Sequence, residues 1–362
     1  MSGGTEERPL AVGLIGYGLG GSVFHAPLVA ATAGLHLAAV VTRDAERRRD
    51  VERRYPDARV VPDVDALLAM APTLDLVVVS SPNATHVPHA RAALEAGLHV
   101  VVDKPFAATA DEARDVGALA RRMKRLAIPF QNRRWDGDFL TVQRLLREHA
   151  LGTLYRFESR FERLRAAPKP GWTAPDAAER NEGIVYDIGT HLVDQALVLL
   201  GPAIVVYAEL DRRHPEVVVE DEAFISLVHE SGVRSHLYMS AVAAQPVARM
   251  SVWGSRAAYV KHGLDGQEAA LKVGGIPNAD GWGREPRELW GALGTLDDRH
   301  AYPTEPGAYP AFYAGVERAI RVGDPPPVLA SEAAAALEVI EAVFRSAREG
   351  RAVPCTTTSR TA

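Results

Sequence analysis

LAVGLIGYGLGG, at residues 10–21, places an apolar run directly before a glycine-rich turn. The part at residues 10–18 is apolar enough for a buried strand. Further apolar runs follow, and helix-like segments such as VPHARAALEAG separate them. Strands that are nearly all Val, Leu and Ile, alternating with helices, predict a parallel sheet covered on both faces. The other strands of this sheet are expected at residues 36–43, 74–82, 98–105 and 126–133.

Three glycines follow the first strand with the spacing G-x-G-x-x-G: Gly16, Gly18 and Gly21. Small residues at these positions allow a tight turn and let the backbone approach a pyrophosphate, whose charge a helix N-terminus can bind. Such a triplet alone has low specificity, because it can also serve only a turn. The strand before it, the helix predicted after it and the second strand at the expected distance favour a dinucleotide site.

The end of the second strand, Thr42-Arg43-Asp44, bears on which dinucleotide is bound. An acidic residue about 20 positions past the glycines usually binds the ribose hydroxyls of NAD. Arg43 stands at about that distance, and a guanidinium can pair with the 2′-phosphate of NADP but cannot accept hydrogen bonds from hydroxyls. Thr42 adds a hydroxyl. We therefore predict NADP(H) as the cofactor, with NAD as the alternative that Asp44 leaves open.

The pattern changes after about residue 134. LYRFESRFER, at residues 154–163, alternates aromatic with polar residues, which indicates a half-buried strand. More strand-like runs follow with few helices between them, and HESGVRS contains a hairpin signal. Two helices close the chain, separated by GDPPPV. We predict an α/β protein with a doubly wound parallel domain at residues 1–128. A second α/β domain with a largely antiparallel open sheet, for substrate binding and oligomerisation, is predicted at residues 129–362.

The composition narrows the class of protein. A chain of 362 residues with net charge −5 suits two domains and makes nucleic acid an improbable partner. Its single cysteine, Cys355, stands in a polar C-terminal tail, so no disulfide framework or cysteine metal site is expected. The first residues resemble no export signal, and no apolar run is long enough to cross a membrane. We expect a soluble cytoplasmic protein.

Four groups of residues, in this order, resemble the glucose–fructose oxidoreductase/inositol dehydrogenase (Gfo/Idh/MocA) family over about residues 9–350. They are the glycine turn, the segment Ser81-Pro82-Asn83-Ala84-Thr85-His86, Asp103-Lys104-Pro105 and Asp187-x-x-x-His191. FHAPL (24–28), QNRRWDGDFLTV (131–142) and GQE (266–268) are similar to the branch of NADP-dependent scyllo-inositol 2-dehydrogenases.

The resemblance implies an N-terminal Rossmann domain and hydride transfer between nicotinamide and a secondary alcohol of an inositol or sugar. It carries Lys104, Asp187 and His191 over as the catalytic set, and it suggests a homodimer or homotetramer. By the same resemblance and the glycine-turn argument, the residues expected to bind the cofactor are Gly16, Gly18, Gly21, Thr42, Arg43, Ser81, Pro82, Asn83, His86, Asp103 and Lys104. A keto-sugar reductase and a non-catalytic dinucleotide sensor remain alternatives.

Oxidation of an alcohol needs a base for the hydroxyl proton, and His191 suits this role because its ordinary pKa of about 6.5 lies near neutral pH. Asp187 lies four residues earlier, on the same face of a helix, and could orient His191 or bind a substrate hydroxyl. Lys104, at the end of a parallel strand, could stabilise the developing alkoxide. These residues need no metal, and none is expected. Candidates for substrate contact, besides Asp187 and His191, are Arg134, Trp135, Asp138 and Trp172.

Three positions depart from the family pattern. Asp103 stands where the family usually has Glu, and its carboxylate is therefore one methylene shorter. Asn181-Glu182-Gly183 replaces the Gly-Gly pair that often comes before the Asp-x-x-x-His helix. Gly171 comes before Trp172, where related inositol enzymes often carry Arg. The last two changes fall where a substrate loop is expected, so they leave the substrate open.

Overall fold

A computed structural model describes residues 8–355 and 357, and it contains the predicted parallel sheet. The strands follow in the order β3-β2-β1-β4-β5-β6, the doubly wound order of a dinucleotide-binding domain. The short β3 was not predicted, since only one of its three residues is buried. The strands are β1 (Leu10–Ile15), β2 (Leu35–Val41), β3 (Arg59–Val61), β4 (Leu76–Val79), β5 (His99–Val102) and β6 (Ala127–Pro129).

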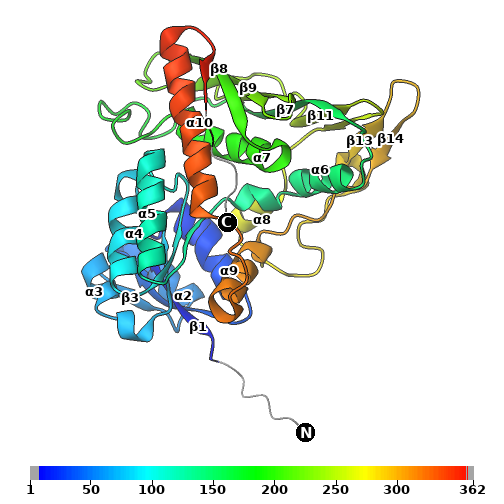
Figure 1. The fold of residues 1–362 in the computed structure, drawn as a ribbon. Helices are drawn as coiled ribbons and strands as arrows, with labels where there is room; N and C mark the ends of the chain where they lie inside the picture. Colours follow the sequence, from blue (N-terminus) through cyan, green and yellow to red (C-terminus); the bar gives the residue numbers. More distant parts are fainter. Residues whose placement is uncertain (1–7, 356, 358–362) are drawn as a thin grey trace.

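Helices cover both faces of this sheet (Figure 1). Asp44 begins α2 by accepting hydrogen bonds from the backbone N–H groups of Glu46 and Arg47, and Thr109 caps α5 in the same way. Gly97, with a φ of 82°, follows the end of α4 as predicted. These helices are α1 (Ala26–Ala30), α2 (Ala45–Arg54), α3 (Val64–Leu68), α4 (His86–Glu95) and α5 (Ala110–Arg122), and the π-helical turn η1 (Gly20–His25) leads into α1.

The second sheet has nine strands in the order β14-β13-β12-β11-β7-β10-β9-β8-β15. All neighbours are antiparallel except β7 and β10, which confirms the largely antiparallel sheet. The predicted hairpin joins β9 and β10. The strands are β7 (Leu154–Glu162), β8 (Ala203–Asp211), β9 (Glu222–His229), β10 (Arg234–Ser240), β11 (Met250–Gly254), β12 (Ala258–Lys261), β13 (Gly291–Gly294), β14 (Arg299–Tyr302) and β15 (Val353–Pro354).

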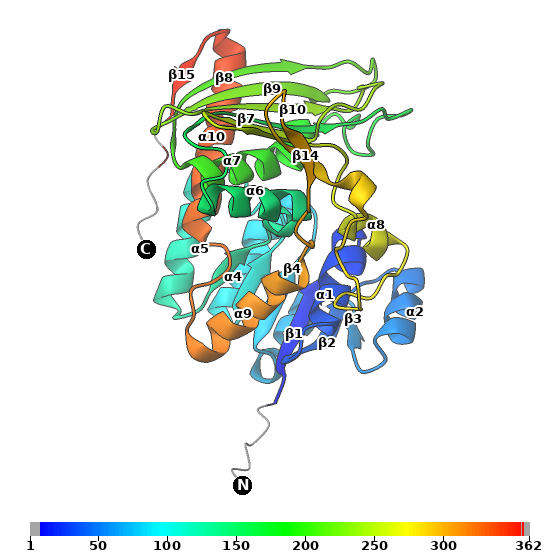
Figure 2. The ribbon, with the colours of Figure 1, turned by 90° about the vertical axis from the view of Figure 1, so that its right-hand side faces the viewer.

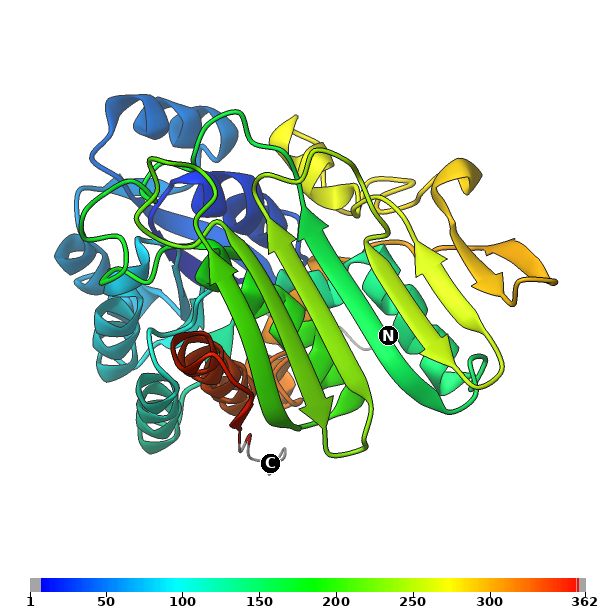
Figure 3. The same cartoon turned by 90° about the horizontal axis from the view of Figure 1, so that it is seen from above.

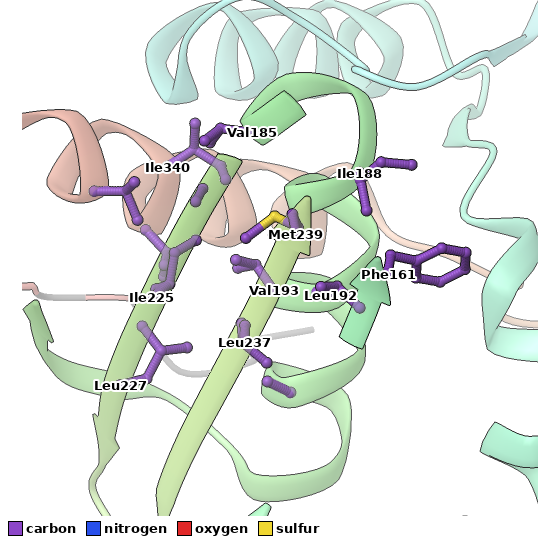
Figure 4. Packing of buried hydrophobic residues seen from close by; sticks show 14 of the residues in the cluster. Phe161, Val185, Ile188, Leu192, Val193, Ile225, Leu227, Leu237, Met239 and Ile340 are labelled. Atoms are coloured by element: carbon purple, nitrogen blue, oxygen red, sulfur yellow. The ribbon is translucent and has the colours of Figure 1, made fainter. Parts of the chain in front are cut away.

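The helices of the second half lie on the side of this sheet that faces the first domain, and the other face is open (Figures 2 and 3). Leu192 and Val193 of α7 pack on Leu237 and Met239 of β10 (Figure 4). The helices are α6 (Gly137–Arg147), α7 (Thr190–Leu200), α8 (Gln267–Lys272), α9 (Pro310–Val322) and α10 (Ala330–Glu349), with the short turns η2 (Ala71–Thr73), η3 (Asn83–Thr85), η4 (Asn132–Trp135), η5 (Val185–Gly189) and η6 (Arg287–Leu289). Within the described residues, no helix is long and apolar enough to cross a membrane.

The last two helices pack on both domains. Leu337 of α10 is buried in the cluster that covers one face of the parallel sheet, whereas Ile340 belongs to the cluster beneath the second sheet. Phe312 of α9 is buried in the cluster on the opposite face of the parallel sheet. The division at residue 128 stays a prediction. Cys355 was expected in a polar tail, but it is 5% exposed, because its backbone N–H donates to the carbonyl oxygen of Ile204 beside β15.

Replacing Leu337 with Ala tests the contribution of α10 to the first domain. The side chain is 3% exposed, so its removal leaves a cavity, and we expect the free energy of unfolding to fall by about 2–4 kcal/mol. Chemical denaturation followed by fluorescence measures this loss. Arg348→Ala, at an exposed position of the same helix, is the control and should change stability by less than about 0.5 kcal/mol. A loss below about 1 kcal/mol for Leu337→Ala would show that the packing of α10 matters little.

Candidate active site

A cavity of about 870 Å³ lies between the two domains, where the strands of the parallel sheet end. Open α/β sheets bind ligands at this edge. The residues that follow β1, β4 and β5 form one wall, and residues of η5 and α7 form the other. The predicted residues that line it are Gly16, Gly18, Arg43, Ser81, Pro82, Asn83, His86, Asp103, Lys104, Asp187 and His191.

The glycine turn fits a dinucleotide pyrophosphate. Gly16 has a φ of 95°, and a Cβ there would lie 2.3 Å from the backbone oxygen of Ser80, so the turn requires glycine. Gly18 faces open space, and no atom lies within 4 Å of the position of a Cβ. An anion can therefore approach this backbone closely. Gly21 packs on the carbonyl oxygen of Gly16 and does not line the cavity.

Arg43, after β2, and Arg47, in α2, both line the cavity. Asp44, the competing acidic residue, uses Oδ1 to accept hydrogen bonds of 2.9 Å from the backbone N–H groups of Glu46 and Arg47. Its carboxylate thus caps α2. Thr42 is 6% exposed, its Oγ1 accepts a hydrogen bond from the backbone of Asp44, and it does not line the cavity. The side chains of Arg43 and Arg47 therefore line the cavity, whereas Thr42 and Asp44 do not.

His86 is buried and connects two loops of the first-domain wall of the cavity. Its Nδ1 lies 2.8 Å from the carbonyl oxygen of Pro105, and its Nε2 lies 2.8 Å from that of Ser81. The side chain is 1% exposed, so it supports these loops from behind. Asn83 donates from Nδ2 to the carbonyl oxygen of Asn181, across to the other wall, at 3.2 Å. The peptide bond between Lys104 and Pro105 is cis.

The shorter Asp103 has a complete set of partners. Its Oδ1 accepts a hydrogen bond of 2.8 Å from the backbone N–H of Lys104, and its Oδ2 accepts one of 3.0 Å from the Ser80 hydroxyl. Oδ2 also lies 3.4 Å from Nε2 of the buried His25, whose Nδ1 lies 2.6 Å from the hydroxyl of Tyr313. Burial opposes the charge, but His25 outweighs it and holds the pKa of Asp103 well below its usual range. The carboxylate therefore fixes the backbone of Lys104.

Asp187 binds two lysines. Nζ of Lys104 donates to Oδ1 of Asp187 at 2.7 Å and to the backbone oxygen of Asp187 at 2.8 Å. Nζ of Lys169 lies 2.9 Å from Oδ2. Burial opposes the charge of Asp187, but the two ammonium groups outweigh it and hold its pKa well below the usual range. The carboxylate is thus ionised, and Lys104 is held at the junction of the two walls.

His191 is 5% exposed, and its Nδ1 lies 3.1 Å from Oε1 of Gln131. The suggestion that Asp187 orients this imidazole is wrong, because both oxygens of that carboxylate face lysines and Gln131 takes the orienting role. With Gln131 as the acceptor, Nδ1 carries the hydrogen and Nε2 keeps a lone pair. Burial, with the charges of Arg133 and Lys104, lowers the pKa of His191 well below 6.5, so it is neutral at neutral pH.

The backbone before α7 explains one departure from the family pattern. Asn181 has a φ of 52°, the left-handed region that glycine usually occupies and that Asn tolerates best among other residues. Gly183 has a φ of 107°, and a Cβ there would lie 2.3 Å from Oε1 of Glu220. That oxygen accepts a hydrogen bond of 3.2 Å from the backbone N–H of Val185, at the start of η5. Glu220 therefore supports the turn that carries Asp187.

Four predicted substrate residues lie outside the cavity lining. Arg134 is buried and pairs with Asp194 at 2.6 Å and with Glu332 at 2.9 Å. Asp138 is 1% exposed and faces Arg249, Trp172 is 1% exposed in the hydrophobic core, and Trp135 packs edge-on against Phe312. The preceding residues of η4, Asn132 and Arg133, line the cavity instead. In a tight helical turn, adjacent side chains point in different directions. No sequence pattern indicated which residues of η4 would face the cavity.

Two family models match this chain. Residues 10–130 match the model described as an oxidoreductase family with an NAD-binding Rossmann fold, and residues 139–260 match the GFO/IDH/MocA C-terminal domain. The uncharacterized oxidoreductase YdgJ of Escherichia coli is 40% identical over 350 residues, which cover 96% of this chain and 98% of YdgJ. The chain belongs to the GFO/IDH/MocA oxidoreductase family. This confirms the resemblance inferred from the four groups of residues.

Two further similarities concern relatives from Bacillus subtilis. The scyllo-inositol 2-dehydrogenase (NADP(+)) IolW is 31% identical over 357 residues, which cover 98% of each chain. The structure of the putative oxidoreductase yvaA superposes with a TM-score of 0.90 at 31% identity, covering 96% of this chain and 99% of that one. Both similarities extend over both domains, so this GFO/IDH/MocA chain shares the complete architecture of these relatives and is an NAD(P)-binding oxidoreductase.

Several residues of the site in this GFO/IDH/MocA chain were not predicted from the sequence: Gln131, which orients His191, and the cavity residues Arg163, Arg165, Lys169 and Glu268. Gln131 and Glu268 stood inside segments quoted for the resemblance, but no spacing rule assigned them a role. Lys169 lies in the irregular segment before Trp172, where no periodic pattern tells which side chain faces inward. In β7 every second residue faces the core, and Arg163 and Arg165 follow the strand in step with the buried Phe157 and Phe161. Extending that alternation past the strand end could have placed both on one side.

Glu220→Gln tests the support beneath η5 through the pH dependence of stability. Burial raises the pKa of Glu220 to about 7 from 4.5, so the folded protein holds this proton more tightly than the unfolded chain. The contribution of Glu220 to the free energy of unfolding is therefore fully present below pH 4.5 and is lost as the pH rises to about 7. Gln stays neutral and can accept the same hydrogen bond. We expect the variant to avoid this loss, which amounts to roughly 1–3 kcal/mol.

Thermal unfolding of both proteins between pH 4.5 and 8 measures the difference. Other groups titrate equally in both proteins, so the wild-type curve minus the variant curve isolates Glu220. Parallel curves would show that Glu220 does not hold a proton in the folded protein.

Proposed function

We propose that this chain is an NADP(H)-dependent oxidoreductase that transfers a hydride between nicotinamide and a secondary alcohol of an inositol or a sugar. The observation that carries the proposal is the position of Lys104, Asp187 and His191, which line the same cavity as the glycine turn. The names of relatives, among them an NADP-dependent scyllo-inositol 2-dehydrogenase, support the same class of reaction.

The groups of this chain handle the proton of the alcohol. The neutral His191 accepts it at Nε2, while Gln131 holds Nδ1. The ammonium of Lys104 donates a hydrogen bond to the oxygen and stabilises the negative charge that develops there. Asp187 holds that ammonium in place from the other wall. When bound, NADP⁺ supplies the hydride acceptor. In reduction, the same imidazole returns the proton.

The choice of NADP over NAD rests on two cations and one occupied carboxylate. Arg43 and Arg47 line the cavity after β2, where dinucleotide-binding domains hold the ribose end of the cofactor. Asp44 caps α2 with its carboxylate. A 2′-phosphate suits two guanidinium groups, whereas ribose hydroxyls lack the acceptor that an acidic residue would provide.

The open face of the nine-stranded sheet supports self-association. Phe224 of β9 and Tyr238 of β10 pack together on it with ring centroids 4.9 Å apart, and Tyr155 of β7 is 53% exposed. Aromatic side chains that are only half-buried on an uncovered sheet are typical of contacts between protein chains. We therefore propose a homo-oligomer that uses this face.

Turnover of NADP⁺ with a panel of inositols, aldoses and glucosides tests the reaction, and two variants test its groups. Lys104→Met and His191→Ala should each lower kcat by about 100-fold or more, since each removes a group that acts on the reacting oxygen. NADPH fluorescence should show that both still bind the cofactor. His36→Ala, exposed at the start of β2, is the control. Near-normal rates in both variants would remove this mechanism, and no turnover with the whole panel would contradict the proposed reaction.

The double variant Arg43→Ala/Arg47→Ala tests the choice of cofactor. Loss of two charge-assisted contacts to a 2′-phosphate should lower kcat/KM for NADPH by about 10- to 100-fold. The value for NADH should change by less than about 3-fold, because NADH lacks that phosphate. Arg49→Ala is the matched control, because Arg49 lies in α2 with Arg47 but does not line the cavity. A wild-type enzyme that prefers NADH, or an equal loss for both cofactors, would contradict the prediction.

A further inference from the structure

Two arginines directly after β7, Arg163 and Arg165, line the cavity. The backbone N–H of Arg163 donates to the carbonyl oxygen of Ser240 at 3.0 Å, and that of Arg165 donates to Ala241 at 2.8 Å. Leu164, between them, is 64% exposed. Alternate residues of an extended segment point to the same side, so the two guanidinium groups share the cavity side while Leu164 points away.

The segment is held by bonds that do not involve either guanidinium. Nε2 of His214 lies 3.2 Å from the carbonyl oxygen of Arg165, and Nδ1 lies 2.6 Å from Oδ2 of Asp221. Asp221 Oδ2 also accepts a hydrogen bond of 3.0 Å from the backbone N–H of His214. These contacts therefore fix the backbone of the segment that carries the two like charges.

The acidic groups at this end of the cavity already have partners. Asp187 pairs with Lys104 and Lys169, and Glu268 pairs with Lys272 at 2.5 Å and with Arg133 at 2.6 Å. Over residues 8–355 and 357, neither Arg163 nor Arg165 has a side-chain hydrogen bond or ion pair. Burial and the neighbouring charge of Arg165 lower the pKa of Arg163. The region thus carries an excess of positive charge that an anion would relieve.

We propose that Arg163 and Arg165 form an anion subsite, and that the preferred substrate is a polyol or sugar that carries a carboxylate or a phosphate ester. The proposal rests on the proposed function and adds the charge of the substrate. A guanidinium binds either anion through parallel N–H donors, and two of them can hold one anionic group from adjacent sides.

The location favours the substrate over the cofactor as the source of this anion. The charged groups that act on Arg163 include Asp187 and Glu268, both on the wall of the second domain. The cofactor's phosphates have their own donors, the glycine turn and the pair of Arg43 and Arg47 on the first domain. An anion held after β7 therefore belongs to a molecule next to the catalytic lysine and histidine.

The test compares neutral and acidic substrates at constant ionic strength and saturating NADP⁺. The neutral set is scyllo-inositol, myo-inositol and glucose, and the acidic set is glucuronate, gluconate, glucose 6-phosphate and inositol 1-phosphate. The variants are Arg163→Gln and Arg165→Gln. Arg180→Gln is the matched control, because it removes a charge that is 40% exposed in the same connection, paired with Asp176 and outside the cavity lining.

We expect the wild-type enzyme to use at least one acidic compound with a kcat/KM about 10-fold or more above its neutral counterpart. Each arginine variant should lose about 10- to 100-fold for that compound and less than about 3-fold for neutral ones, while Arg180→Gln changes neither. A preference confined to glucuronate and gluconate identifies a carboxylate, and one confined to the phosphate esters identifies a phosphate.

Equal or better use of the neutral compounds by the wild-type enzyme would overturn the subsite and leave the proposed function intact. A rise in KM for NADPH in the variants, with an unchanged ratio of acidic to neutral turnover, would assign the arginines to the cofactor instead. If nothing in the panel turns over, the proposed function fails, and calorimetry on the NADPH complex decides the subsite. Gluconate or inorganic phosphate should then bind the wild type about 10-fold more tightly than either variant, and equal binding refutes it.

Discussion

The hydrogen-bonded ion pair between Lys104 and Asp187 joins the two halves of this protein at the place where its cavity lies. Lys104 follows β5 of the parallel sheet, whereas Asp187 belongs to η5 beneath the second sheet. A lysine alone at a strand end would be mobile and solvated. Here Asp103 fixes its backbone and Asp187 fixes its ammonium, so two carboxylates from different domains determine where the positive charge sits.

This arrangement sets the state of the neighbouring histidine. The positive charges of Lys104 and Arg133 add to burial in keeping His191 neutral, the form that accepts a proton. Asp187 cannot serve both as the partner of two lysines and as the partner of the imidazole. Gln131, an uncharged acceptor, orients His191 without raising its pKa as a carboxylate would. In the proposed reaction, the group that stabilises negative charge, Lys104, is therefore distinct from the group that takes the proton, His191.

The sequence predicted the elements of the fold better than the directions of its side chains. The glycine turn, the strands of Val, Leu and Ile, the β9–β10 hairpin and the final helices depend on short-range patterns, and the structure confirms them. Arg134 and Asp138 were preferred over Arg133, since no pattern fixes the phase of a four-residue turn such as η4. Asp187 was expected to share a helix face with His191, but it lies in a π-helical turn, where the residue spacing per turn differs.

The sequence by itself determined the class of fold, the glycine turn and the family, because these are recorded in residues close together along the chain. Only the tertiary structure decided which groups meet at the site. Two pairs are far apart in sequence: Lys104 with Asp187, and His191 with Gln131. The members of each pair meet only when the second sheet and its helices, among them α10, pack on the first domain. The positive charge that Arg163 and Arg165 bring to the cavity likewise follows from the backbone pairing after β7, which no local pattern specifies.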